Sequence, residues 1–167
     1  MKLKLVSRKG GFTLIEILVV IGIIAVLAGI VLIAINPARQ FAQARNSQRT
    51  SNVQTILNAI GQNIADNKGI FTCSSHPYFT GSQVAISKTG ANIRPCLVPT
   101  YVPEIALDPA AAAGDFTCVD STPGDCSTGT YDTKYTVSTS TTNRFTVCAP
   151  NASEPAISGS TQICVTR

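Results

Sequence analysis

An apolar run of 24 residues, 12–35 (FTLIEILVVIGIIAVLAGIVLIAI), constrains the fold of this chain more than any other feature. It is broken only by Thr13 and by one charged residue, Glu16. As a helix it spans about 36 Å at 1.5 Å per residue, against about 30 Å for the hydrocarbon core of a bilayer. The rest of the chain is too small to bury a helix that is apolar on every side. The run therefore predicts a membrane-inserted helix.

Charge fixes the expected orientation of this helix. Four basic residues and no acid precede Glu16, at positions Lys2, Lys4, Arg8 and Lys9. They predict a cytoplasmic N-terminus, with the C-terminal part sent across the membrane. The net charge of +4 belongs to this leader, because the residues after position 11 carry nine acids and nine bases. The body of the chain has no basic patch, so nucleic acid is not expected as the primary partner.

An ordinary secretory signal peptide is a weaker interpretation of the same run. Its apolar region has about 7 to 15 residues and precedes a cleavage site of small residues. Here the run is longer and ends at Asn36-Pro37. A cut is favoured before the run, where Gly10 and Gly11 give a flexible backbone.

Glu16 is the unusual residue of the run. An acid at the centre of a membrane helix costs about 2.5 to 3.5 kcal/mol on insertion scales, and somewhat less one turn inside its end. An ionisable group there needs a partner, so a functional role is the default interpretation. The alternative is that Glu16 reaches the headgroup layer and has no function.

The string 9–16 (KGGFTLIE), with basic residues before it and the apolar run after it, resembles the class III leader of type IV prepilins and pseudopilins. The resemblance implies that residues 1–11 are a leader peptide. A membrane prepilin peptidase would cut between Gly11 and Phe12 and methylate the new Phe12 amine. Glu16 would then pair with that amine on a neighbouring subunit.

Physical chemistry agrees with this implied role of Glu16. Cleavage leaves a positive amine at the lipid-buried tip of the helix, one helical turn from the acid, so matching the two charges would set the register between subunits. Before cleavage, Glu16 is expected to lack such a partner. Small residues at Gly22, Ala25 and Gly29 are spaced for close packing with other membrane helices.

Residues 12–36 are thus expected to form the membrane-spanning, filament-core half of one helix of about 55 residues, and residues 37–68 its amphipathic half. Pro37 is expected to kink this helix from an interior position. The second half carries apolar residues at spacings of three and four, and it should stop near 66–69. Its arginines, Arg39, Arg45 and Arg49, are expected to face solvent or lipid headgroups.

Residues 69–167 are predicted to form a globular head with an antiparallel sheet packed on this helix, giving an α+β, pilin-like fold. Residues 134–138 and 144–148 alternate apolar and polar side chains and are joined through 140–143, which predicts a hairpin. Residues 161–166 predict a third strand. Shorter apolar stretches cover 78–87 and 97–105, and Pro99 and Pro103 make the second an edge or a loop.

Six cysteines, all in the exported head, predict three disulfides. Fifteen connectivities remain open, and chain proximity favours Cys73–Cys96, Cys118–Cys126 and Cys148–Cys164. A zinc site is a weaker alternative, because the chain has no C-x-x-C motif. The single histidine, His76, is expected in a surface loop rather than in a catalytic role.

The head carries no recognisable catalytic motif, so no enzymatic activity, cofactor or catalytic residue is predicted. Four acids are expected to be solvated residues of turns, namely Asp115, Asp120, Asp125 and Asp132. Calcium binding by these acids is a weaker alternative. Asn151-Ala152-Ser153 fits the N-glycosylation pattern. A three-residue pattern often occurs by chance, so the match is interpreted as incidental.

The predicted function is that of a structural subunit of a type IV pilus-like filament. Its partners would be other copies, the prepilin peptidase, and an inner-membrane assembly platform with its motor. The subunit would wait in the cytoplasmic membrane and end in an extracellular filament. Two alternatives stay open: a pseudopilin of a type II secretion system, and a membrane-anchored surface binding module that does not assemble.

Overall fold

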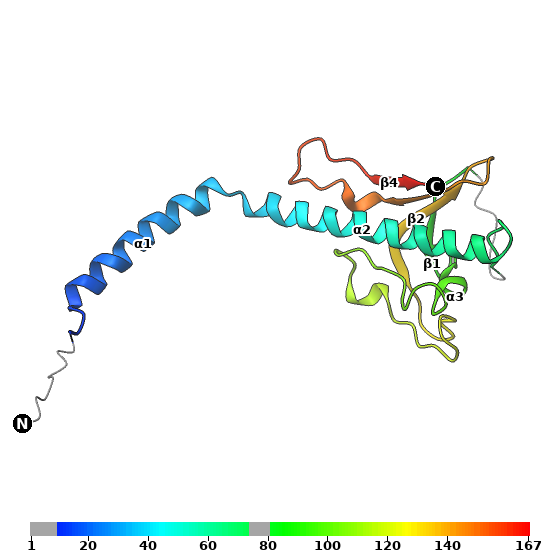
Figure 1. Ribbon diagram of the computed structural model, residues 1–167, viewed down its shortest axis with the longest axis horizontal. Helices are drawn as coiled ribbons and strands as arrows, with labels where there is room; N and C mark the ends of the chain where they lie inside the picture. Colours follow the sequence, from blue (N-terminus) through cyan, green and yellow to red (C-terminus); the bar gives the residue numbers. More distant parts are fainter. Residues whose placement is uncertain (1–9, 74–80) are drawn as a thin grey trace, which may run out of the picture. The chain divides into compact units, whose positions relative to one another are not determined.

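The computed structural model describes residues 10–73 and 81–167, and side chains throughout these ranges except at positions 32–34 (Figure 1). The basic leader residues and His76 lie outside the described residues. The chain divides into two compact units, Met1–Ala38 and Arg39–Arg167. Each unit is described by itself below.

In the described part of the first unit, the apolar run forms helix α1 (Leu14–Ala34). Its residues Leu14–Val31 are long and apolar enough to cross a membrane, and none of them is buried within the chain. Exposed fractions range from 50% at Val19 to 82% at Leu14. Because apolar side chains on every side of a helix need an apolar solvent or a partner, α1 matches the predicted membrane helix.

The helix does not continue through Pro37. α1 ends at Ala34, and Ile35 has extended backbone angles of φ −98° and ψ 114°. Pro37 is the first residue of the next helix, α2 (Pro37–Asp66). The expectation of one helix with an interior proline kink was therefore wrong. The residue before a proline avoids helical angles, whereas proline itself fits the first position of a helix, where its missing N–H costs nothing.

α2 supplies one side of the core of the second unit. Val53, Ile56, Leu57 and Ile60 are at most 3% exposed and lie at the predicted helical spacing. The helix ends where the sequence predicts its stop. Gly69 has a φ of +89°, and its N–H donates to the Ile64 carbonyl at 2.8 Å, closing the C-terminus of the helix.

The head contains a four-stranded antiparallel sheet in the order β1-β2-β3-β4. Its strands are β1 (Val84–Ser87), β2 (Asp132–Thr139), β3 (Phe145–Ala149) and β4 (Ile163–Thr166). The hairpin and the third strand predicted from the sequence are confirmed as β2, β3 and β4. In the register, Val137 lies opposite Val147, which lies opposite Val165.

One face of the sheet packs on α2, as Figure 1 shows. The core cluster joins the apolar residues of α2 to Tyr135 and Val137 of β2 and to Val147 of β3. Asn52 of α2 lies in this contact and donates to the Tyr135 hydroxyl at 2.9 Å. The predicted α+β fold, with a long helix on a small antiparallel sheet, is confirmed.

The rest of the head is irregular and held by three disulfides. Residues 97–105 contain no strand, and the short helix α3 (Arg94–Leu97) precedes them. The disulfides are Cys73–Cys96, Cys118–Cys126 and Cys148–Cys164. They are the pairs that chain proximity favours. Cys148 and Cys164 lie directly opposite each other on β3 and β4.

Candidate functional site

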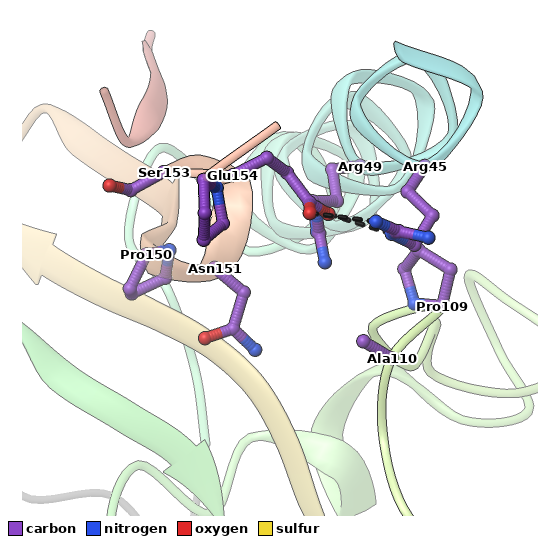
Figure 2. Close-up of a pocket in the computed structure, with 9 residues that line it drawn as sticks. Arg45, Arg49, Pro109, Ala110, Pro150, Asn151, Ser153 and Glu154 are labelled. Carbon is purple, nitrogen blue, oxygen red and sulfur yellow. Dashed lines mark hydrogen bonds and ion pairs between the residues drawn. The ribbon is translucent and has the colours of Figure 1, made fainter. Parts of the chain in front are cut away.

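The head contains a largely buried cluster of charged side chains beside a cavity (Figure 2). Arg49 of α2 is 1% exposed. Its guanidinium donates to both carboxylate oxygens of Asp108, at 2.7 and 3.0 Å, and to Glu154 Oε1 at 2.6 Å. Arg45, one turn earlier, donates to both oxygens of Glu154 at 2.7 Å. The cluster holds α2 against the loop after Asp108 and against the segment after the short 3-10 helix η2 (Pro150–Ala152).

The charged groups of this cluster are paired with one another, which indicates a structural role. Hydrogen bonds from Arg45 and Arg49 lower the pKa of the Glu154 carboxyl to about 2. Burial raises the pKa of Asp108, but the Arg49 guanidinium and the Ala110 N–H outweigh it and leave the pKa below its ordinary value. Two positive and two negative groups balance in charge. The adjoining cavity of about 590 Å³ is walled partly by Pro109, Pro150 and Pro155.

The expectation that these arginines face solvent or headgroups was wrong for Arg49, whereas Arg45 is 37% exposed and also pairs with Glu154. Their partners, Asp108 and Glu154, lie 59 to 109 residues further along the chain. Helical periodicity marks which side of α2 Arg49 occupies, but it does not show that two distant acids lie there. Only the folded head brings these four groups together.

A second buried arginine, Arg94, organises the loops on the other side of the head. It is 2% exposed and donates to both Glu104 and Asp120, with 2.7 Å from its Nε to Glu104 Oε1 and 2.7 Å from Nη1 to Asp120 Oδ1. Its guanidinium lies 5.2 Å from the centre of the Phe116 ring. Hydrogen bonds from Arg94 lower the pKa of Asp120 well below its ordinary value.

The other acids considered for calcium also have protein partners. Lys134 Nζ lies 2.8 Å from Asp115 and 2.9 Å from Asp132. Asp125 accepts turn N–H groups, among them that of Thr122 at 3.0 Å. Within residues 10–73 and 81–167, no three His, Cys, Asp or Glu side chains converge as a metal site would require.

The remaining site lies at the start of α1, where Thr13 and Glu16 form a capping box. Glu16 Oε2 accepts hydrogen bonds from the Thr13 backbone N–H and hydroxyl, both at 2.8 Å. In return, the Glu16 N–H donates to Thr13 Oγ1 at 3.2 Å. This arrangement satisfies backbone donors that the first turn of a helix otherwise leaves without partners.

The sequence analysis considered only a charged amine as the partner of Glu16, whereas the structure also gives it a neutral hydrogen-bonding partner. Thr13 is this partner, and the signal was present in the sequence as a threonine followed three residues later by a glutamate. Both hydrogen bonds go to Oε2. Glu16 Oε1 accepts no hydrogen bond from the part of the chain that the structure describes.

The residues just before this helix are accessible. Residues 10–13 are not helical, Gly10 and Gly11 are exposed, and Phe12 is 86% exposed. A side chain placed at either glycine would meet nothing within 4 Å. The bond between Gly11 and Phe12 therefore lies in exposed, non-helical backbone that an enzyme can reach.

Gly22, Ala25 and Gly29 are exposed along α1. Their spacing of three and four residues places them on one face of the helix. No atom lies within 4 Å of a Cβ built at either glycine. Nothing within the described part of the first unit requires these small residues.

Comparison with known protein families gives a match in the N-terminal part of the chain. Residues 6–32 match the family model described as "Prokaryotic N-terminal methylation motif". This segment is a class III prepilin leader with the apolar helix that follows it. Such a leader is shared by type IV pilins and pseudopilins. No curated protein and no solved structure matches the chain.

The prepilin leader match contains Gly11, Phe12, Glu16 and the small residues of α1. It ends before α2, so it does not include the head or its two arginine clusters. Thr13 is the site residue that the sequence analysis missed, because it was treated only as an interruption of the apolar run.

Proposed function

We propose that this protein is a structural subunit of a type IV pilus-like filament. The observation that carries the proposal is the prepilin leader joined to a helix that is apolar and exposed on every side. A head with its own core and three disulfides follows this helix. A helix of this kind is stable in lipid before assembly and among other copies of itself afterwards.

Processing comes first in the proposed sequence of events. The basic leader holds the N-terminus in the cytoplasm and the head is exported. Prepilin peptidase cuts between Gly11 and Phe12, in the open segment before α1, and methylates the Phe12 amine. The capping box survives this cut, because both Thr13 and Glu16 lie after it.

Assembly then uses the free side of Glu16. The Phe12 amine of a neighbouring copy binds Glu16 Oε1, while Oε2 stays with Thr13. A charge-assisted hydrogen bond of this kind is strengthened in an apolar layer, and it forms only in one register between the two helices. An inner-membrane platform and its motor supply the work of extraction from the membrane.

Close helix packing completes the filament core. Gly22, Ala25 and Gly29 let the backbone of a second helix approach α1, since lipid gives no hydrophobic drive for association. The open space at both glycines fits this role. The head is exposed to the exterior.

Two variants of Glu16 test the proposal. Glu16→Gln keeps the capping box, because glutamine also serves at this position, but removes the negative charge. Glu16→Val removes both. We expect both variants to insert and to be cleaved at Gly11, and both to be absent from sheared filaments seen by electron microscopy. Filaments of Glu16→Gln at the wild-type level would contradict the charge pairing.

Mass spectrometry of the native protein separates filament processing from a plain membrane anchor. We expect a mature chain that starts at N-methylated Phe12. A chain that still starts at Met1 and never polymerises would refute the proposed function and support the anchor.

A further inference from the structure

The segment that joins α1 to the head is exposed along its whole length in the described chain. Every residue from 35 to 41 is exposed, and burial begins at Ala42, which is 0% exposed. We call residues 35–41 the neck. Its two large apolar side chains, Ile35 and Phe41, are 47% and 66% exposed. Neither belongs to the core cluster of the described head.

The position of Phe41 matters more than its exposure. Single exposed apolar residues are scattered over most protein surfaces and carry little meaning by themselves. Phe41, however, follows a helix of 21 residues that is apolar on every side. At 1.5 Å per residue this helix spans about 32 Å, close to the hydrocarbon thickness of about 30 Å. When α1 spans a membrane, Ala34 at its end therefore lies near one edge of the hydrocarbon.

The short connection keeps Phe41 close to that edge. Only Ile35 and Asn36 separate α1 from α2, and Phe41 is the fifth residue of α2. With extended links of about 3.5 Å and a helical rise of 1.5 Å per residue, the Cα atoms of Ala34 and Phe41 are at most about 17 Å apart. Because α1 and α2 are separate helices, the first turn of α2 need not continue along the axis of α1. The phenyl ring can therefore reach the headgroup layer, which is about 5 to 8 Å thick on each side of the hydrocarbon.

The composition of the neck suits a membrane interface. Besides its two apolar side chains it contains Asn36, Arg39 and Gln40, whose polar groups can reach lipid headgroups. Segments that lie in this layer combine apolar side chains such as phenylalanine with basic ones, and they bury the apolar side where headgroups meet acyl chains. The neck carries one base and no acid, so it contains no group that lipid phosphates repel.

We propose that the neck is a lipid-binding anchor in which Phe41 inserts at the boundary between headgroups and acyl chains. The partner is the phospholipid surface around the point where α1 leaves the membrane. This contact fixes the depth of the chain in the membrane and holds the base of the head at the lipid surface. The inference rests on the proposed membrane residence of α1 and is independent of filament assembly.

Tryptophan fluorescence tests this anchor directly, because the chain contains no tryptophan of its own. The full chain is placed in phospholipid vesicles whose acyl chains carry bromine either near the headgroup or near the chain end. For Phe41→Trp we expect blue-shifted emission and about a twofold loss of fluorescence with bromine near the headgroup, and a smaller loss with deep bromine.

Ile70→Trp is the matched control for Phe41→Trp. Ile70 is also a large apolar residue, and it is 70% exposed. It lies past the far end of α2, and that end is about 38 Å from residue 41 at 1.5 Å per residue. We expect Ile70→Trp to emit as in water and to be unaffected by either bromine position.

Ile24→Trp, in the middle of α1, separates a failure of the anchor from a failure of the proposed membrane residence. We expect deep bromine to quench it, as a membrane-spanning α1 requires. If it is not quenched, both the membrane residence and the anchor are refuted. If it is quenched but Phe41→Trp emits as in water, or if Phe41→Trp and Ile70→Trp are quenched equally, only the anchor is overturned.

Discussion

Removing Arg49 tests how the head is attached to α2. Arg49→Met keeps the apolar stem but removes every hydrogen bond to Asp108 and Glu154. Glu154 keeps Arg45, whereas the fully buried Asp108 keeps only neutral donors such as the Ala110 N–H at 2.8 Å. Removing one partner of a buried ion pair costs about 3–5 kcal/mol.

That cost is large for a domain of this size. Natural domains are stable by only about 5–15 kcal/mol, and 1 kcal/mol shifts the melting temperature of a domain of this length by about 3–5 °C. We therefore expect Arg49→Met to melt about 10–20 °C lower than the wild type. The full chain in detergent micelles can be followed by near-ultraviolet circular dichroism, because Tyr131 and Tyr135 are buried in the core.

Two further variants decide whether the lost charge balance is the cause. The double variant Arg49→Met, Asp108→Leu removes both charges, and we expect it to recover about half of the lost stability. Arg144→Met, in the exposed β2–β3 loop, is the control and should melt like the wild type. If the double variant is less stable than the single variant, the reasoning is refuted.

Further tests concern pH, a crosslink and a tight turn. Because the folded state holds the pKa of Glu154 at about 2, below its ordinary 4.5, this group stabilises the head above pH 4.5. We expect that contribution to fade as the pH falls from 4.5 to 2, and Glu154→Gln to remove it from the unfolding curve. Replacing Cys118 and Cys126 by alanine opens a nine-residue loop and should cost about 2.5 kcal/mol in denaturant titrations. Gly124→Ala should cost at least about 2 kcal/mol, because the φ of +88° is strained for alanine and its Cβ would lie 2.5 Å from the Val98 oxygen; a wild-type melting temperature would contradict that estimate.

The sequence predicts well those features that depend on neighbouring residues. β2 and β3 alternate apolar and polar side chains and are joined by a short loop, so their pairing is encoded within about 20 residues. The stop of α2 is equally local, because it depends on Gly69 and its positive φ. α1 is also predicted locally, because it lies within one continuous apolar run.

Pro37 shows how a local signal can be given the wrong weight. It was interpreted as a kink inside one helix, although the same residue is favoured at the first position of a new helix. The deciding factor is the preceding pair, Ile35 and Asn36. α1 ends at Ala34 and Ile35 is already extended, so the helix stops before Asn36, the residue that Pro37 restricts.

The arginine clusters could not be predicted, for a different reason. Arg94 finds Glu104 and Asp120 in two separate loops, and Arg49 finds its acids in two others. No periodicity links positions that are brought together only by loop paths. The exposed side of α2 could not be predicted for the same reason. Which side of the helix stays exposed depends on how the head packs against it.

The capping box explains how one acid can serve both membrane residence and assembly. An unpartnered carboxylate in lipid is costly, and Thr13 lowers this cost within the subunit by binding Oε2. A carboxylate with both oxygens occupied would have little reason to bind a neighbour, whereas both hydrogen bonds from Thr13 go to Oε2, which in the proposed filament leaves Oε1 for the Phe12 amine. Glutamine at position 16 would keep the capping box but would lack the negative charge. Valine would supply neither. Under the proposed function, the requirement for glutamate at position 16 therefore comes from the neighbouring subunit, while threonine at position 13 serves the subunit that has not yet assembled.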